Sequence, residues 1–237
     1  MPTIVSLPQM GEDRDVIRFA PKLVLAFLML LGAVAHTQQV APPFEQEILK
    51  FEAEDAKNPP AKFGVVFVGS STIRLWTTLA QDFPEYNVIN RGFGGSALAD
   101  SVRYAHRIVT PYEPRLVVLF AGTNDIAAGK SAETVSQDFT AFVGKVREKL
   151  PKVKIAYLSI SPAPSRWSKI EEIKRANRLI ETICRKGRDL TFLNTFPKML
   201  DAKGGPRPEL YVSDQLHLNQ DGYTILVDEV RKLLPKK

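Results

Sequence analysis

The chain has little of what metal-dependent or disulfide-bonded proteins require: one cysteine and three histidines among 237 residues. A single cysteine excludes an internal disulfide and any cluster of thiolate metal ligands. Cys184 lies late in a helical pattern, where a free cysteine is usually a small packed side chain rather than a reactive one. With so few nitrogen and sulfur ligands, the sequence predicts no zinc site and no cofactor.

The chain also lacks a concentrated basic surface, although its formal net charge is +6. The basic residues surround two helical patterns, where acids such as Glu148 and Glu171 are interspersed with them. No aromatic-rich segment that could stack bases accompanies them, as single-stranded nucleic-acid binding would require. We therefore interpret the excess charge as a solvated surface and predict no nucleic-acid partner.

One long apolar run is present near the amino terminus, at residues 23–35, and it follows three basic residues, Arg14, Arg18 and Lys22. It ends in Ala-Val-Ala at 33–35, the small-x-small pattern that precedes a signal-peptidase cut. The run is shorter than the ~20 residues that span a bilayer. The sequence predicts a signal peptide over residues 1–35 and a periplasmic or secreted mature protein without stable membrane insertion. An uncleaved membrane anchor is the alternative interpretation.

Residues 36–62 are expected to form an amino-terminal helix and a connection. Phe44, Ile48 and Phe51 recur at the spacing of one helix face, and the sequence Asn-Pro-Pro at 58–60 ends the pattern. After it, five mostly β-branched apolar runs follow at 64–68, 88–89, 116–121, 153–160 and 190–193. Continuous apolar runs are typical of strands that are covered on both faces.

Helical patterns alternate with these runs, at residues 131–150, from Ser168 and from Gln220. Ser168 and Glu171 have the spacing of a capping box, which predicts that the second of these helices begins there. Alternating strands and helices predict βαβ units, hence an α/β fold of three layers with a five-stranded parallel sheet. We expect residues 63–237 to form this single domain.

Ligands bind at the carboxyl ends of the strands in such sheets. Three small or polar segments follow the first three strands: 69–72, 90–96 and 122–125. A serine hydroxyl in such a segment is a useful nucleophile only beside a general base, usually histidine. His106 lies in a helical pattern and is interpreted as structural, whereas His217 lies in a loop three residues after Asp214. That spacing allows the carboxylate to hold the imidazole, although a turn aspartate that caps its own backbone is an open alternative.

In order, these segments resemble the conserved blocks of the SGNH (GDSL-type) hydrolases. Phe67 to Thr72 resembles the first block with Ser71 in the nucleophile position, although Ser70 replaces the usual aspartate. The resemblance implies a flavodoxin-like fold, a Ser71–His217–Asp214 triad and an oxyanion hole formed by the N–H groups of Ser71 and Gly95 and the side chain of Asn124. Asp125, next to Asn124, is expected to cap the helix that follows.

The resemblance implies a serine esterase whose substrate is a small-molecule or saccharide ester, and we expect short, acetyl-type acyl groups. Trp76, Arg166 and Trp167 are candidate substrate contacts, with packing as the alternative for the tryptophans. A catalytically inactive carbohydrate-binding relative stays open, because fold does not secure activity. A nucleotide-binding protein is the weaker alternative, since Gly92-x-Gly94-x-x-Ala97 loosely fits a dinucleotide fingerprint but follows the second strand rather than the first.

Overall fold

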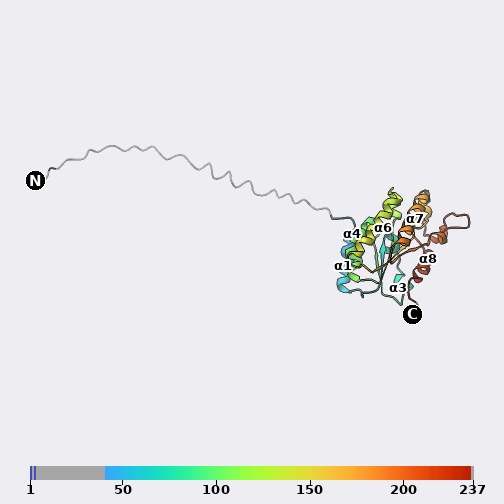
Figure 1. The fold of residues 1–237 in the computed structure, drawn as a ribbon, viewed down its shortest axis with the longest axis horizontal. Helices are drawn as coiled ribbons and strands as arrows, with labels where there is room; N and C mark the ends of the chain where they lie inside the picture. The colour runs from blue at the N-terminus through green and yellow to red at the C-terminus, as the bar shows by residue number, and fades with distance from the viewer. Residues whose placement is uncertain (2, 4–40, 236–237) are drawn as a thin grey trace. The chain divides into compact units, whose positions relative to one another are not determined.

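A computed structural model of the chain describes residues 1, 3 and 41–235 (Figure 1). The chain divides into two units, Met1–Val40 and Ala41–Lys237, and the fold below is that of the second. Apart from Met1 and Thr3, the predicted signal peptide lies outside the described residues and stays a prediction of the sequence. Within the described part of the chain, every helix is too short or too polar to cross a membrane.

A five-stranded parallel sheet forms the centre of the domain. Its strands lie in the order β2-β1-β3-β4-β5, and their bounds are β1 Val65–Gly69, β2 Val88–Gly92, β3 Leu116–Phe120, β4 Lys154–Leu158 and β5 Leu190–Leu193. Every residue of β1 and β3 is buried, because both strands are central and covered on both faces. The strand order is that of the flavodoxin-like doubly wound sheet, so the predicted α/β fold is confirmed.

Helices cover both faces of the sheet (Figure 1). One apolar cluster joins alternate strand residues such as Val66 and Val117 to four helices: α1 Glu45–Lys57, α4 Leu98–Ile108, α6 Ala132–Arg147 and α7 Ile170–Lys186. The opposite cluster joins Val65 and Phe67 to three helices: α2 Ser71–Arg74, α3 Leu79–Asp82 and α8 Gln220–Arg231. Shorter turns complete the domain: η1 Thr110–Tyr112, α5 Thr123–Ala127, η2 Pro164–Lys169, η3 Phe196–Met199 and η4 Pro208–Leu210.

The amino-terminal helix α1 is tied to the sheet domain by ion pairs. Arg107 of α4 binds Glu45 and Glu52 with N–O distances of 2.8 and 2.6 Å. Arg91 of β2 is 6% exposed and binds Asp55 at 2.5 Å. A buried charge of this kind requires a partner, so the predicted segment 36–62 supplies contacts that the edge strand β2 needs.

The predicted capping box at the start of α7 is wrong. Ser168 lies inside η2, and Glu171 pairs with Lys174 at 2.8 Å instead of reaching back to a cap. The reason is Pro164, which begins the 3-10 helix η2, and η2 runs directly into α7 at Ile170. A helix entered from another helical turn has no free first turn for a capping side chain to satisfy.

Candidate active site

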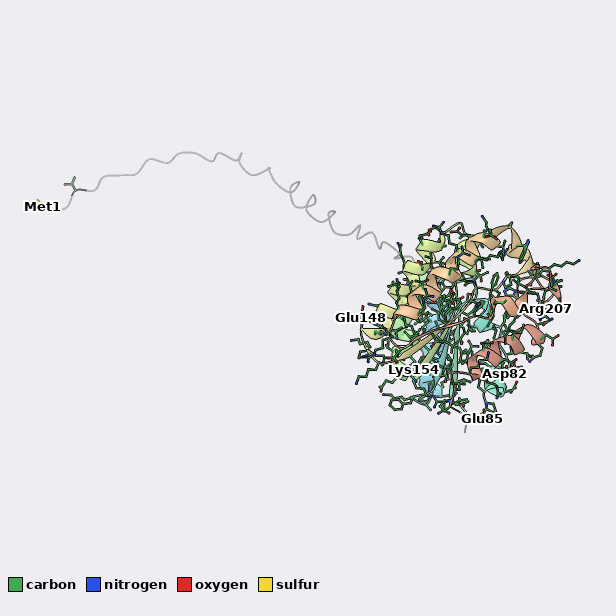
Figure 2. All side chains as sticks on the ribbon, turned by 45° about the vertical axis from the view of Figure 1, so that its right-hand side comes forward. Met1, Asp82, Glu85, Glu148, Lys154 and Arg207 are labelled. Carbon is green, nitrogen blue, oxygen red and sulfur yellow. The ribbon has the colours of Figure 1, made fainter. Side chains whose placement is uncertain are left out.

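The carboxyl ends of β1, β3 and β4 converge at one edge of the sheet. In Figure 2, Glu85, which precedes β2, lies at the lower edge of the domain, Lys154, which begins β4, lies above it, and Arg207, which follows β5, lies at the right-hand edge. Ser71 begins α2 directly after β1. It therefore lies where ligands bind in parallel α/β sheets.

The structure brings Ser71, His217 and Asp214 together, although Ser71 and His217 are 146 residues apart. His217 Nε2 lies 2.9 Å from Ser71 Oγ, and His217 Nδ1 lies 2.6 Å from Asp214 Oδ2. A hydroxyl, an imidazole and a carboxylate in series is the arrangement that a serine nucleophile requires. Chemically, it can move a proton from Ser71 to His217 and hold the resulting imidazolium against Asp214.

A tight turn positions Asp214 and His217. Asp214 Oδ1 accepts the N–H groups of Leu216 and His217, both at 2.9 Å, while Oδ2 faces the imidazole. The two sequence interpretations of Asp214, turn cap and histidine partner, are therefore both present, one on each oxygen. The backbone N–H of His217, followed by its side chain and the N–H of Leu216, lowers the pKa of Asp214 to about 2. The carboxylate is thus charged at every pH at which the domain would work.

The loop 93–97 and α5 supply the groups expected to bind an oxyanion. Asn124 Nδ2 donates one hydrogen bond to Ser96 O at 2.9 Å, which leaves the second N–H of that amide to be directed elsewhere. Gly95 has a φ of +84°, a conformation that residues with side chains rarely adopt, and a Cβ built there meets no atom of the described residues within 4 Å. Glycine is therefore required at position 95 by the backbone turn, and the space beside it is open to an incoming group.

Asp125 has a different role from the one expected. Its side chain is fully buried, and Oδ2 accepts the N–H of Leu98 at the start of α4 at 2.9 Å. Oδ1 binds the ammonium group of Lys130 at 2.8 Å. Asp125 thus caps α4 and not the helix that follows it.

A small pocket opens beside Ser71. Its free volume is about 10 Å³, close to the space of a single water molecule, and it is bounded by groups from four loops, among them Phe120, Thr123, Asn124, Ser161, Leu216 and His217. The sequence did not predict Ser161 as a site residue. In the loop after β4 it predicted the arginine and the tryptophan as substrate contacts instead. The available signal was the position of Ser161 just past the carboxyl end of a central strand.

The expectation that Trp76 contacts substrate is wrong. Trp76 is 1% exposed, its ring packs against Phe67 and Tyr223, and its Nε1 donates to Asp82 at 2.6 Å. Because α2 is only four residues long, the chain turns back after it and carries Trp76 into the core. Arg166 and Trp167 are half-buried on η2, beyond the pocket residue Ala163, and remain predictions as substrate contacts.

The other residues weighed for chemistry have structural surroundings. His106 Nε2 lies 2.9 Å from Lys145 O and 3.1 Å from Glu148, where it joins α4 to α6. Burial raises the pKa of the Cys184 thiol to about 12, so it is not a thiolate at neutral pH. Among the described residues, no group of three or more histidine, cysteine or acidic side chains could hold a metal ion.

The glycines of the loose dinucleotide fingerprint pack against Arg74. A Cβ built on Gly92 would lie 2.2 Å from Arg74 N, and one built on Gly94 would lie 2.5 Å from Arg74 Nε. These glycines therefore let α2 approach the end of β2 closely. That packing accounts for them without a bound pyrophosphate.

The chain is similar to several known proteins. It is 27% identical over 194 residues to platelet-activating factor acetylhydrolase IB subunit alpha1 from Bos taurus, a match that covers 78% of this chain and 79% of that protein. A GDSL-like lipase from Bacteroides thetaiotaomicron has the same fold, with a TM-score of 0.69, 22% identity and coverage of 78% and 96%. A family 3 carbohydrate esterase from Talaromyces cellulolyticus superposes with a TM-score of 0.58, 18% identity and coverage of 71% and 95%.

The family assignment rests on a match to a family model. Residues 64–225 match the GDSL-like Lipase/Acylhydrolase family, more than half of the 237 residues. The matched span contains all five strands and includes Ser71, Asn124 and His217. The chain therefore belongs to the GDSL-like lipase/acylhydrolase family and is an ester hydrolase.

Proposed function

We propose that the protein is a serine esterase that works through an acyl-enzyme on Ser71. The observation that carries the proposal is the continuous series from Ser71 Oγ to His217 Nε2 at 2.9 Å and from His217 Nδ1 to Asp214 Oδ2 at 2.6 Å. Ser71 Oγ attacks the ester carbonyl carbon while its proton passes to Nε2. The alcohol then leaves with that proton. A water molecule next gives a proton to His217, attacks the acyl carbon and releases the acid, and the proton returns to Ser71.

The negative charge of the tetrahedral intermediate needs donors that are in place before the reaction. We assign this role to the N–H groups of Ser71 and Gly95 and to the second N–H of the Asn124 amide. The bond from Asn124 to Ser96 at 2.9 Å supports the assignment, because it ties the two donor loops to each other. Fixed donors of this kind stabilise developing charge without reorganisation during the step.

The size of the pocket favours a short acyl group. A free volume of about 10 Å³ has room for one group the size of a methyl or a water molecule. Acetyl places one such group next to the carbonyl, whereas each further methylene has to be accommodated outside this space. The alcohol side is proposed to be a saccharide or another small alcohol, a choice supported by the fold shared with the family 3 carbohydrate esterase.

A series of p-nitrophenyl esters, measured beside an acetylated xylan, tests this proposal. We expect kcat/KM to fall by about 10-fold to 100-fold for the first methylene added to acetate, in the range that a pocket imposes per excess methylene, and to fall further for butyrate and decanoate. Equal or faster turnover of decanoate would contradict the short-acyl assignment. Absence of turnover on all of them, with retained binding of saccharide, would favour the inactive carbohydrate-binding relative.

Replacing Asn124 separates a donor to the transition state from a residue that only holds its loop. Asn124→Ala is expected to lower kcat by about 10²-fold to 10³-fold with KM nearly unchanged, the effect of losing one oxyanion donor. Steady-state kinetics with p-nitrophenyl acetate measure both constants. Ser136→Ala, which removes a hydroxyl bonded within α6 to Glu133 O, is the control and should leave kcat unchanged. A lower kcat with a similarly raised KM, together with a lower melting temperature, would show that Asn124 only holds its loop.

A further inference from the structure

Two buried serines in the loop after β4 have contrasting surroundings. Ser159 is fully buried and its Oγ accepts the N–H groups of Thr195 and Phe196 at 3.1 and 3.0 Å. Ser161, two residues later, is 5% exposed, and its Oγ has no hydrogen-bond partner among the described residues. Buried hydroxyl groups in native proteins nearly always have a hydrogen-bond partner, so the unpaired hydroxyl of Ser161 requires an explanation.

The loop around Ser161 is held rigidly. Asn177 of α7 binds both backbone groups of Ile160, since Oδ1 accepts its N–H at 2.9 Å and Nδ2 donates to its carbonyl at 3.0 Å. Ser159 is fixed on the other side by the turn after β5. Ser161 is therefore presented in one position by its neighbours, and the fold itself leaves its hydroxyl unpaired.

The unpaired hydroxyl belongs to a residue that lines the pocket beside Ser71. Much of the surrounding wall is apolar, from Phe120, Ala163 and Leu216. A buried hydroxyl without a partner is unfavourable, and Ser161 combines this feature with a place in the wall of the candidate site. A polar atom of a bound substrate that reached Ser161 would remove the deficit, whereas a methyl group would leave it in place.

We propose that Ser161 is a specificity-determining residue that hydrogen-bonds a polar atom of the acyl group. The inference rests on the proposed function and makes it more specific. The hydroxyl can donate and accept, so it recognises an α-hydroxyacyl ester of the glycolyl type better than a propionyl ester. Both acyl groups extend one heavy atom beyond acetyl, and they differ only in whether that atom is an oxygen or a carbon.

The test compares glycolyl and propionyl esters of the same alcohol in the full chain and in Ser161→Ala. The glycolyl-to-propionyl ratio of kcat/KM should fall about 3-fold to 10-fold in the variant, the effect of one neutral hydrogen bond. Comparing the ratio between proteins cancels the different intrinsic reactivity of the two esters. Ser101→Ala is the matched control, because Ser101 Oγ is also buried without a partner in the described part of the chain but lies on α4 and is not part of the pocket wall.

Thermal unfolding distinguishes recognition from structure. Removing an unpaired buried hydroxyl should leave the melting temperature of Ser161→Ala unchanged or raise it, as in Ser101→Ala. An unchanged ester ratio, or a lower melting temperature with equal losses on both esters, overturns the inference. Turnover of acetyl esters with neither glycolyl nor propionyl accepted also overturns it. If no ester is hydrolysed by the unmodified chain, the proposed function fails and the inference fails with it, whereas turnover with an unchanged ratio removes the inference alone.

Discussion

Ser71→Ala is expected to lower kcat by a factor on the order of 10⁶, the loss seen when a serine hydrolase loses its nucleophile. The reason is chemical rather than structural. Ser71 is half-exposed at the start of α2, and its Oγ hydrogen-bonds His217 Nε2, so alanine removes the attacking atom while the backbone of the turn stays in place. Residual hydrolysis should reflect the oxyanion donors and substrate binding alone. Single-turnover and steady-state assays with p-nitrophenyl acetate measure the loss.

Ser70 provides the control, because it is adjacent, of the same type, and also lines the pocket. It is 3% exposed, and its backbone N–H donates to Phe120 O at 3.3 Å. Ser70→Ala should keep turnover and should still be labelled by a fluorophosphonate, whereas Ser71→Ala should lose both. A label that mapped to Ser70 by peptide mass spectrometry would show that the nucleophile had been assigned one residue too late.

The fold was predictable because its signals are local and repeated. Continuous apolar runs such as 116–121 are typical of central strands, and β3 occupies Leu116–Phe120 with every residue buried. Boundaries that depend on side-chain capping were less predictable. The start of α7 was misplaced because Pro164 begins a separate 3-10 helix, and propensity does not say where one helical turn passes into the next.

The candidate site was predictable where order along the chain implies proximity in space. Ser71 and Asn124 follow neighbouring strands β1 and β3, so the topology alone places them together. The sequence does not predict which way a side chain points. For that reason Trp76 was expected at the site, although it faces the core. Ser161 was not predicted, because a single serine gives no compositional signal. Its proposed role depends on a hydrogen bond that its Oγ lacks among the described residues.

Asp214→Asn is expected to lower kcat by about 10⁴-fold, as for the loss of the carboxylate in other serine triads. Asn at this position can keep its Oδ1 on the N–H groups of Leu216 and His217, which hold the turn. Its Nδ2, a donor, then faces His217 Nδ1, which must accept. The ring proton is thereby driven to Nε2, where it points at Ser71 and blocks proton transfer. The fold persists while the imidazole is held in the wrong tautomer.

Asp201→Asn is the matched control for this change. Asp201 Oδ1 accepts the N–H groups of Lys203 and Gly205, both at 2.8 Å, in a turn of the same kind that contains no histidine. The control should therefore lose one charge and keep its kcat. Similar small losses in both variants would show that Asp214 acts only as a turn cap.

The pH dependence of kcat in Asp214→Asn tests whether the tautomer of His217 explains the loss. Because the pKa of Asp214 is lowered to about 2, its charged form stabilises the folded state above about pH 4, and that contribution is lost as pH falls toward 2. The deficit in kcat should consequently persist from pH 6 to 9, since the native carboxylate does not titrate there. A deficit that vanished at high pH would contradict this explanation, because the tautomer of a neutral ring does not change with pH.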